Sequence, residues 1–160
     1  MEKPLWKFTD SQGSFSSDAA GKINTLYFPL CNTAPFVSSL SPDLHGDIKT
    51  AFNSFLLEPV SRHSLKDLRS SRNFWVYIHA DKAWSATGVA RNNADIQKYD
   101  CIELEAGLLW HKVSRLNKKI GLKSRILSFV PASGEPVELA LVTLENISGK
   151  PVRFLPTAAI

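Results

Sequence analysis

Cysteine and long hydrophobic runs are both scarce in this 160-residue chain. Its two cysteines, Cys31 and Cys101, cannot form a disulfide framework, and we expect both to be reduced thiols in apolar surroundings. No apolar run approaches the roughly 18–20 residues of a membrane-spanning helix, so we expect no membrane association. The N-terminal segment contains a glutamate and no apolar core, so no signal peptide is visible. The sequence therefore predicts a soluble cytoplasmic protein.

Histidine and recognisable catalytic motifs are equally sparse. The four histidines show no metal-ligand spacing, and they are His45, His63, His79 and His111. His79 and Asp81 fit one side of a strand end, but two ligands leave a zinc site incomplete. The sequence has no nucleophile elbow, Cys-x-x-Cys pair or phosphate-binding glycine loop. We therefore predict no catalytic residue, no metal and no cofactor in this chain.

The charge balance is mildly basic, at +4 from 19 basic and 15 acidic residues. A nucleic-acid binder concentrates such an excess on one element and interleaves it with aromatic side chains. Here the basic residues form two loose groups, at 62–72 and 112–125, without that pattern. We therefore expect no nucleic-acid partner, but a solvated face or a surface that meets anionic ligands or a protein.

Strand patterns dominate the second half of the chain. They are Asn73–Ile78, Cys101–Ala106 with a hairpin partner at Leu108–Ser114, Ile120–Val130, Val137–Glu145 and Val152–Leu155. In the second of these, apolar and acidic residues alternate, so Glu103 and Glu105 predict a solvated face rather than a catalytic pair. Val137–Glu145 is apolar on both faces at its centre, which is typical of a strand in a sandwich interior.

The first half is more irregular. Short strand candidates separated by prolines occur at Thr25–Phe28, Pro35–Val37 and Phe52–Leu57. Only Ser64–Arg69 has helical character, with Ser64 as the N-cap. Strands at about ten-residue spacing, with proline and glycine between them, predict an all-β fold with an antiparallel β-sandwich.

The C-terminal end is unusual for a complete sandwich. Residues Thr157–Ile160 are apolar and uncharged, and they follow a strand that has just begun, whereas chain ends usually fray through polar residues. We therefore expect residues 1–160 to be a single β-sandwich domain or a fragment of one, incomplete at this end. An uncovered sheet edge favours pairing with a second copy, so we expect a homo-oligomer.

Aromatic residues are the best candidates for recognition. Tryptophan beside polar residues is a common platform for the apolar face of a sugar ring. Trp75 lies within an aromatic strand and is more typical of a core. For Trp84, in Lys82–Gly88, a sugar platform and a core position both remain open.

The order of motifs along the chain is more specific than any one of them. The first half contains Leu26–Asn32, Pro42–Thr50, Phe55–Ser61, Ser71–Tyr77 and Trp84–Gly88, and the second half Tyr99–Leu104, Gly121–Pro131, Glu138–Asn146 and Arg153–Thr157. This ordered set, from about Phe8 to Ile160, resembles the N-terminal region of the inverting phosphorylases of glycoside hydrolase family 94. Within that family it is most similar to the 1,2-β-oligoglucan phosphorylases.

The resemblance implies a bacterial protein with a galactose-mutarotase-like β-sandwich of the supersandwich type. In such enzymes the general acid and the phosphate-binding residues belong to a separate (α/α)6 barrel, so no catalytic residue is carried over to this chain. The sandwich helps to form the dimer, and a loop from it approaches the active site of the partner subunit. A β-glucan oligosaccharide is the implied ligand of the whole enzyme.

The segments implied to face substrate are Pro42–Thr50 and Arg72–Gly88. Within them, the candidate carbohydrate-binding residues are Trp84, Arg72, Asp47 and Lys49. The leading hypothesis is a non-catalytic, carbohydrate-binding-type sandwich of an oligosaccharide phosphorylase. The alternative is a free-standing carbohydrate-binding module with an exposed Trp84, and a self-sufficient small enzyme is a third reading.

Overall fold

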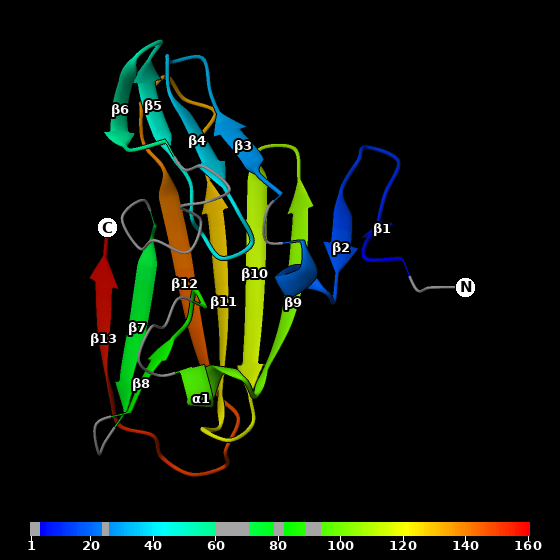
Figure 1. Cartoon of the computed structure of the whole chain (residues 1–160), viewed down its shortest axis with the longest axis vertical. Helices are drawn as coiled ribbons and strands as arrows, with labels where there is room; N and C mark the ends of the chain where they lie inside the picture. The colour runs from blue at the N-terminus through cyan, green and yellow to red at the C-terminus, as the bar shows by residue number, and fades with distance from the viewer. Residues whose placement is uncertain (1–3, 24–25, 60–70, 79–81, 89–93) are drawn as a thin grey trace.

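The chain is built almost entirely of antiparallel β-strands (Figure 1). The structure is a computed structural model that describes residues 4–23, 26–59, 71–78, 82–88 and 94–160. In these ranges there are thirteen strands, one short helix α1 (Ala94–Gln97) and one 3-10 turn at Ala20–Lys22. No helix among the described residues has the length and apolar character needed to cross a membrane.

The largest sheet has six strands in the order β1-β2-β9-β10-β11-β12. Their bounds are β1 (Lys7–Phe8), β2 (Phe15–Ser17), β9 (Asp100–Gly107), β10 (Trp110–Asn117), β11 (Leu122–Phe129) and β12 (Leu139–Asn146). The turn between β10 and β11 ends at Gly121, which has a φ of 72°. A Cβ there would lie 2.3 Å from the Cβ of Ser148, so this turn requires glycine.

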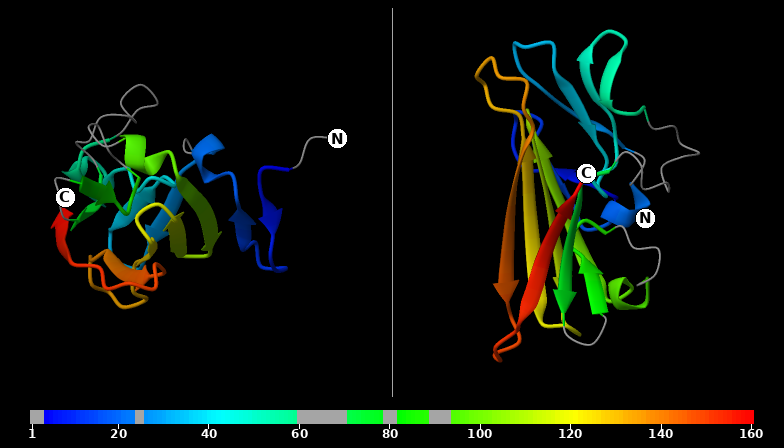
Figure 2. Two further views of the ribbon diagram at one scale, coloured as in Figure 1. Left: turned by 90° about the horizontal axis from the view of Figure 1, so that it is seen from below. Right: turned by 90° about the vertical axis from the view of Figure 1, so that its left-hand side faces the viewer.

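Two smaller sheets pack on one side of the six-stranded sheet (Figure 2). One has the order β13-β7-β8, with β13 (Phe154–Ala159), β7 (Asn73–Ile78) and β8 (Lys82–Ser85). The other has the order β3-β4-β5-β6, with β3 (Phe28–Cys31), β4 (Val37–Leu40), β5 (Ile48–Ala51) and β6 (Ser54–Leu57). This layering of antiparallel sheets is consistent with a β-sandwich.

All three sheets contribute to the main hydrophobic core. Its largest buried members are Trp84, Phe36, Leu30, Leu40, Leu44, Leu122 and Ile126. Strand β11 shows the underlying period of two, because Leu122 and Ile126 are buried while Arg125 between them is exposed. A second, smaller cluster lies under β9 and β10 and contains Leu104 and Val113.

The all-β, antiparallel expectation is confirmed, and several strands coincide closely with the sequence pattern. Strand β7 has the predicted bounds, and β9 and β10 form the predicted hairpin, although β10 begins at Trp110. In the first half, the strand expected at Pro35–Val37 lies at Val37–Leu40 instead. The helix expected at Ser64–Arg69 falls outside the described residues.

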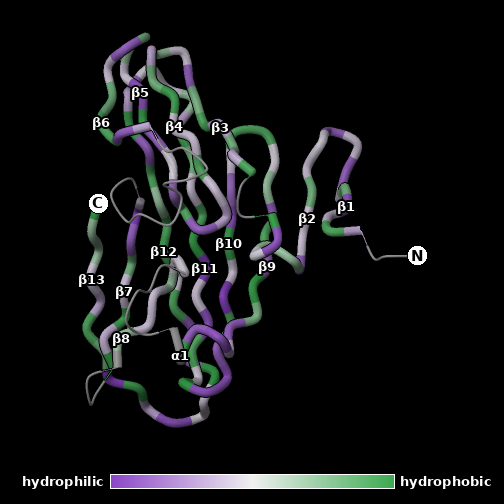
Figure 3. The backbone as a smooth tube through the Cα atoms, viewed as in Figure 1, coloured by the Kyte–Doolittle hydropathy of each residue, from purple (hydrophilic) through white to green (hydrophobic). Residues whose placement is uncertain are grey.

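The expectation of an interior strand at Val137–Glu145 is wrong. Strand β12 forms the edge of the six-stranded sheet and pairs only with β11 among the described strands. Val142 and Leu144 pack against the core from one of its faces, whereas Leu141 on the other face is 60% exposed. Figure 3 shows hydrophobic positions along both β12 and β13, and β13 is exposed along its whole length. Apolar character on both faces of β12 therefore does not mark an interior strand here.

The expectation for the cysteines is correct for only one of them. Cys31 on β3 is partly buried, but Cys101 is exposed on β9. The inward positions of β9 are Ile102, Leu104 and Ala106, and the last two are fully buried. Because neighbouring side chains of a strand point to opposite faces, Cys101 is directed away from the core.

Candidate functional site

The indole of Trp84 lies in the protein core rather than at a sugar-accessible surface. Its exposed fraction is 0%, and its cross-strand neighbour Val76 is equally buried. Its Nε1–H donates to the two carboxylate oxygens of Asp100, at 3.1 and 3.3 Å. The assignment of Trp84 as an exposed platform therefore does not hold in this structure, and the core interpretation applies. A large apolar ring with one satisfied polar atom is well suited to such a position.

Asp100 belongs to a buried polar cluster that includes Asn117, Arg115 and Asp43. Asn117 Nδ2 donates to Asp100 at 2.7 Å, and Arg115 forms an ion pair with Asp43 at 2.9 Å. Burial raises the pKa of Asp100, opposed by hydrogen bonds from Asn117 and Trp84 and by the charge of Arg115. Burial lowers the pKa of Arg115, opposed by Asp43 and Asp100. Arg115 also forms an ion pair with Asp100 at 3.6 Å, so the buried charged groups are paired with one another, which is typical of a structural element.

Arg72 is buried in a second cluster, where its guanidinium joins three segments of the chain. It forms a bidentate ion pair with Glu138, at 3.1 Å from Nε and 2.7 Å from Nη2. Nη1 donates to the carbonyl oxygen of Gly46 at 2.7 Å, and Nη2 donates to Ser38 Oγ at 2.9 Å. Nη2 also approaches the carbonyl oxygen of Asp47 at 3.4 Å. We call Arg72, Glu138, Ser38 and the carbonyl groups of Gly46 and Asp47 the Arg72 anchor.

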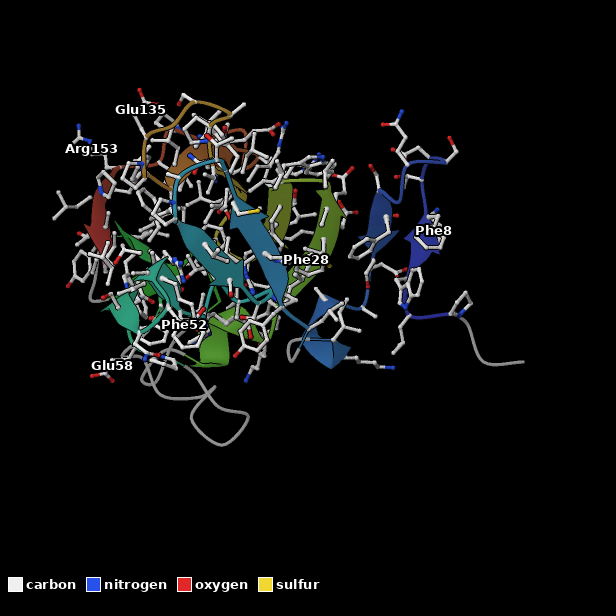
Figure 4. The ribbon with its side chains drawn as sticks, turned by 90° about the horizontal axis from the view of Figure 1, so that it is seen from above. Phe8, Phe28, Phe52, Glu58, Glu135 and Arg153 are labelled. Carbon is white, nitrogen blue, oxygen red and sulfur yellow. The ribbon has the colours of Figure 1, made fainter. Side chains whose placement is uncertain are left out.

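The Arg72 anchor fixes the start of the β5–β6 hairpin, which extends to one end of the molecule (Figures 1 and 2). Lys49 on β5 lies opposite Phe55 on β6, with its Nζ 5.3 Å from the centre of that ring. Phe52 in the turn is 92% exposed, and Leu56 is 65% exposed. Figure 4 shows Phe52 on this hairpin, well apart from Phe8 on the N-terminal strand. The hairpin thus combines a cation with exposed aromatic rings on a fixed base.

The structure therefore brings together three of the four candidate carbohydrate-binding residues. Arg72 and Asp47 meet in the anchor, through the backbone carbonyl of Asp47, and Lys49 follows two positions later. Arg72 is 8% exposed, so it holds the base of the hairpin from within the protein. The sequence pattern does not single out Phe52 and Phe55, because it predicts one strand over Phe52–Leu57, whereas β6 begins at Ser54 and Phe52 lies in the turn before it. A phenylalanine beside Asn53 at a polar turn position was the available signal.

His111 is the most deeply buried of the described histidines. Burial lowers its pKa to about 4, so the ring is neutral at physiological pH. It packs 5.1 Å from Phe28 between ring centres, and neither ring nitrogen has a hydrogen-bond partner within the described residues. Across the described ranges, no group of three or more His, Cys, Asp or Glu side chains is placed to hold a metal ion. His111 therefore has the character of a core residue.

Three features thus characterise the described part of the chain. They are two buried ion clusters, one anchored hairpin with exposed aromatic rings, and an apolar surface along β12 and β13. Comparison of the sequence with protein-family models and with curated proteins finds no match.

Proposed function

We propose that this chain is a non-catalytic, carbohydrate-binding-type β-sandwich of an inverting oligosaccharide phosphorylase that acts on β-glucosidic bonds. The proposal includes the galactose-mutarotase-like type of sandwich. It rests on the ordered motifs between Phe8 and Ile160 that resemble the family 94 phosphorylases, and on one structural observation. That observation is the Arg72 anchor, because it joins the two segments that the resemblance implies to face substrate, Pro42–Thr50 and Arg72–Gly88.

The anchor supports this proposal because burying its two charged side chains is energetically unfavourable. Burying a guanidinium and a carboxylate carries a desolvation penalty of several kcal/mol per ion, and an apolar pair of similar volume is often as stable. The ion pair of Arg72 and Glu138, with side chains 9% and 8% exposed, instead fixes the direction in which the β5–β6 hairpin leaves the sandwich. A fixed hairpin is of use when its tip must reach a defined position. We propose that the tip contributes to the carbohydrate site of the assembled enzyme.

The chemistry of the hairpin is suited to a sugar. Phe52 and Phe55 offer apolar ring surface to a pyranose, and Lys49 offers a hydrogen-bond donor beside it. Phe52 is 92% exposed, so its ring contributes little to packing among the residues that the structure describes. A β-glucan oligosaccharide is the ligand that we propose for this surface in the whole enzyme.

The non-catalytic part of the proposal is supported by the state of the carboxylates. Inverting phosphorolysis needs a protonated carboxylic acid at the glycosidic oxygen and a cationic pocket for phosphate. The buried carboxylates of Asp100 and Glu138 are held by structural hydrogen bonds and cations, and Glu105 pairs with Lys112 at the surface.

The apolar surface supports an assembled protein. Strands β12 and β13 are edge strands, and each pairs with one neighbour among the described strands. Their exposed apolar side chains are Leu139, Leu141, Phe154 and Leu155. We propose that a second copy covers this surface in a homo-oligomer, by edge pairing or strand exchange.

The alternative of a free-standing module that uses Trp84 as its platform is disfavoured by the complete burial of that ring.

Activity assays test the proposed function. The purified chain, given a β-1,2-linked glucotetraose and inorganic phosphate, is expected to release no glucose 1-phosphate above a blank. The whole enzyme that carries this domain is expected to release it.

In that enzyme Phe52→Ala is expected to raise KM for the oligosaccharide by about fivefold, because a ring contact contributes on the order of 1 kcal/mol.

Leu108→Ala is the matched control for this test. Leu108 is also highly exposed, at 83%, and lies in a different hairpin turn between β9 and β10. Its KM is expected to equal that of the wild type. Turnover by the isolated chain would refute the non-catalytic assignment, and an unchanged KM for Phe52→Ala would refute the role of the hairpin.

A further inference from the structure

Strand β12 forms one edge of the six-stranded sheet, and it is the longest edge strand among the described residues (Figure 1). All eight residues of Leu139–Asn146 pair with β11 in an unbroken register, so one side of the strand is fully occupied. The other side has no neighbouring strand in the described part of the chain. The backbone N–H and C=O groups on that side are therefore available to pair with a further strand.

The other edge strands of the described sheets are short or contain a proline. Strand β1 has two residues, and β6 and β8 have four residues each. Pro29 lies within β3, and Pro156 lies within β13. A proline in an edge strand has no N–H to offer, so it removes a donor from the free side of that strand. Short strands and prolines protect a sheet edge against further pairing, and β12 has neither form of protection.

The side chains of β12 also favour pairing with another strand. The strand contains no lysine, and its one charged residue, Glu145, lies near its end and pairs with Arg125 at 2.8 Å. The residues before Glu145 are uncharged, so two such strands can lie side by side without charge repulsion. On the outer face Leu141 is 60% exposed, while Val142 and Leu144 pack against the core from the inner face. A long, uncharged and unprotected edge is a template for another chain.

A second copy of this chain is the partner that fits the β12 edge best. Two β12 strands related by a two-fold axis perpendicular to the sheet run antiparallel, and each supplies the donors and acceptors that the other lacks. With the axis at Val142, the pairing spans residues 139–145 of each copy, and the two Glu145 side chains lie at opposite ends of it. An unrelated extended peptide would cover the edge of one molecule, whereas one symmetric contact covers the edges of two.

We propose that two copies pair antiparallel along β12, so that their six-stranded sheets join into one continuous sheet across the dimer. The inference rests on the homo-oligomer of the proposed function, and it selects edge pairing over strand exchange and β12 over β13. Directly opposed residues of an antiparallel pair point to the same face, so the apolar inner face continues across the axis. Such a pairing forms about six to eight hydrogen bonds between the copies, within the roughly 5–15 of a typical protein interface.

Sedimentation of two single lysine variants tests which edge the copies use. Leu141 on β12 and Leu155 on β13 are 60% and 62% exposed, so the same substitution disturbs the core little at either position. Leu141→Lys is expected to weaken the dimer at least about tenfold, because it places the ammonium groups of both copies near the axis on one face of the joined sheet. Leu155→Lys is the matched control, and it is expected to change the dimer affinity less than about twofold. Circular dichroism reports whether each variant keeps its fold.

Hydrogen exchange tests the backbone contact itself. In the wild-type dimer, the β12 amides that face away from β11 are expected to exchange at least about tenfold more slowly than in the Leu141→Lys monomer or in wild-type protein diluted until it dissociates. The β13 amides that face away from β7 are expected to exchange equally fast in all three samples. A dimer held together by side chains alone would leave both sets of amides unprotected.

The outcomes separate this inference from the proposed function. Loss of the dimer in Leu155→Lys, a dimer that persists in folded Leu141→Lys, or unprotected β12 amides in the wild-type dimer would each overturn pairing along β12 and leave the homo-oligomer standing. A wild-type chain that stays monomeric would overturn the homo-oligomer and the pairing together. Neither result bears on phosphorolysis, which the activity assays measure separately.

Discussion

Replacement of Trp84 by alanine is expected to lower the free energy of unfolding by about 3–5 kcal/mol, the range for removing a large aromatic ring from a core. Trp84 is fully buried where the sheets meet, together with Val76 and Ala86. Its loss also removes the indole donor from the buried carboxylate of Asp100. Both a cavity and an under-satisfied carboxylate therefore result. Chemical denaturation monitored by circular dichroism measures the change.

Trp84→Phe separates the two contributions to that effect. The variant keeps most of the apolar volume but not the Nε1–H donor, so a smaller loss of about 1–3 kcal/mol is expected. Because the ring is buried, a folded Trp84→Phe is expected to bind oligosaccharide as well as the wild type. A loss below about 1 kcal/mol for Trp84→Ala would show that the ring is not in the core. Selective loss of sugar binding in a stable variant would restore Trp84 as a platform.

Replacement of Arg72 by alanine is expected to cost a similar amount, about 3–5 kcal/mol, because it leaves the carboxylate of Glu138 buried without its cation. The variant also removes donors from Ser38 and from the carbonyl oxygen of Gly46. The base of the β5–β6 hairpin thereby loses its attachment to Glu138, the residue before β12. Faster hydrogen exchange in Ile48–Leu57 than in β10 and β11 is expected to accompany the loss of stability.

The pair formed by Arg125 and Glu145 provides the matched control. Its ions are 2.8 Å apart, as close as those of the anchor, but both side chains are 48% exposed. Arg125→Ala is therefore expected to cost no more than about 1 kcal/mol. The double variant Arg72→Met with Glu138→Leu is expected to recover most of the stability but not the fixed hairpin. Equal losses for Arg72→Ala and Arg125→Ala would contradict the anchor.

The sequence predicted strands well where one face of a sheet is buried and the other is solvated. On β9 the alternation of Ile102 and Leu104 with Glu103 and Glu105 follows the burial in the structure. The prediction is correct because successive residues of a strand alternate strictly between its two faces, so the local sequence pattern is enough to identify the buried face. The pattern of β12 does not predict its burial, because burial there depends on whether another element covers the second face of the strand.

The candidate sites were harder to predict, because they join residues that are distant in the sequence. Arg72 meets Glu138 across 66 positions. No local pattern distinguishes an indole that faces a core from one that faces solvent. Trp84 and Trp6 both stand beside polar residues, yet one is fully buried and the other is 45% exposed. Only the pairing of the strands separates these outcomes.

The central claim is that this sandwich works as one part of an assembly, and its apolar edge provides the most direct test. Strands β12 and β13 both lie toward the viewer in the right-hand view of Figure 2, and they expose Leu141 and Leu155 at 60% and 62%. A lysine on a sheet edge blocks pairing between chains, so Leu141→Lys with Leu155→Lys is expected to separate the copies while keeping the core intact.

Sedimentation of the purified chain at micromolar concentration measures this association. The wild type is expected to sediment as a homodimer or a larger species, and the double lysine variant as a folded monomer. A wild-type chain that sediments only as a stable 17.7 kDa monomer would contradict the account and would favour a self-contained binding module.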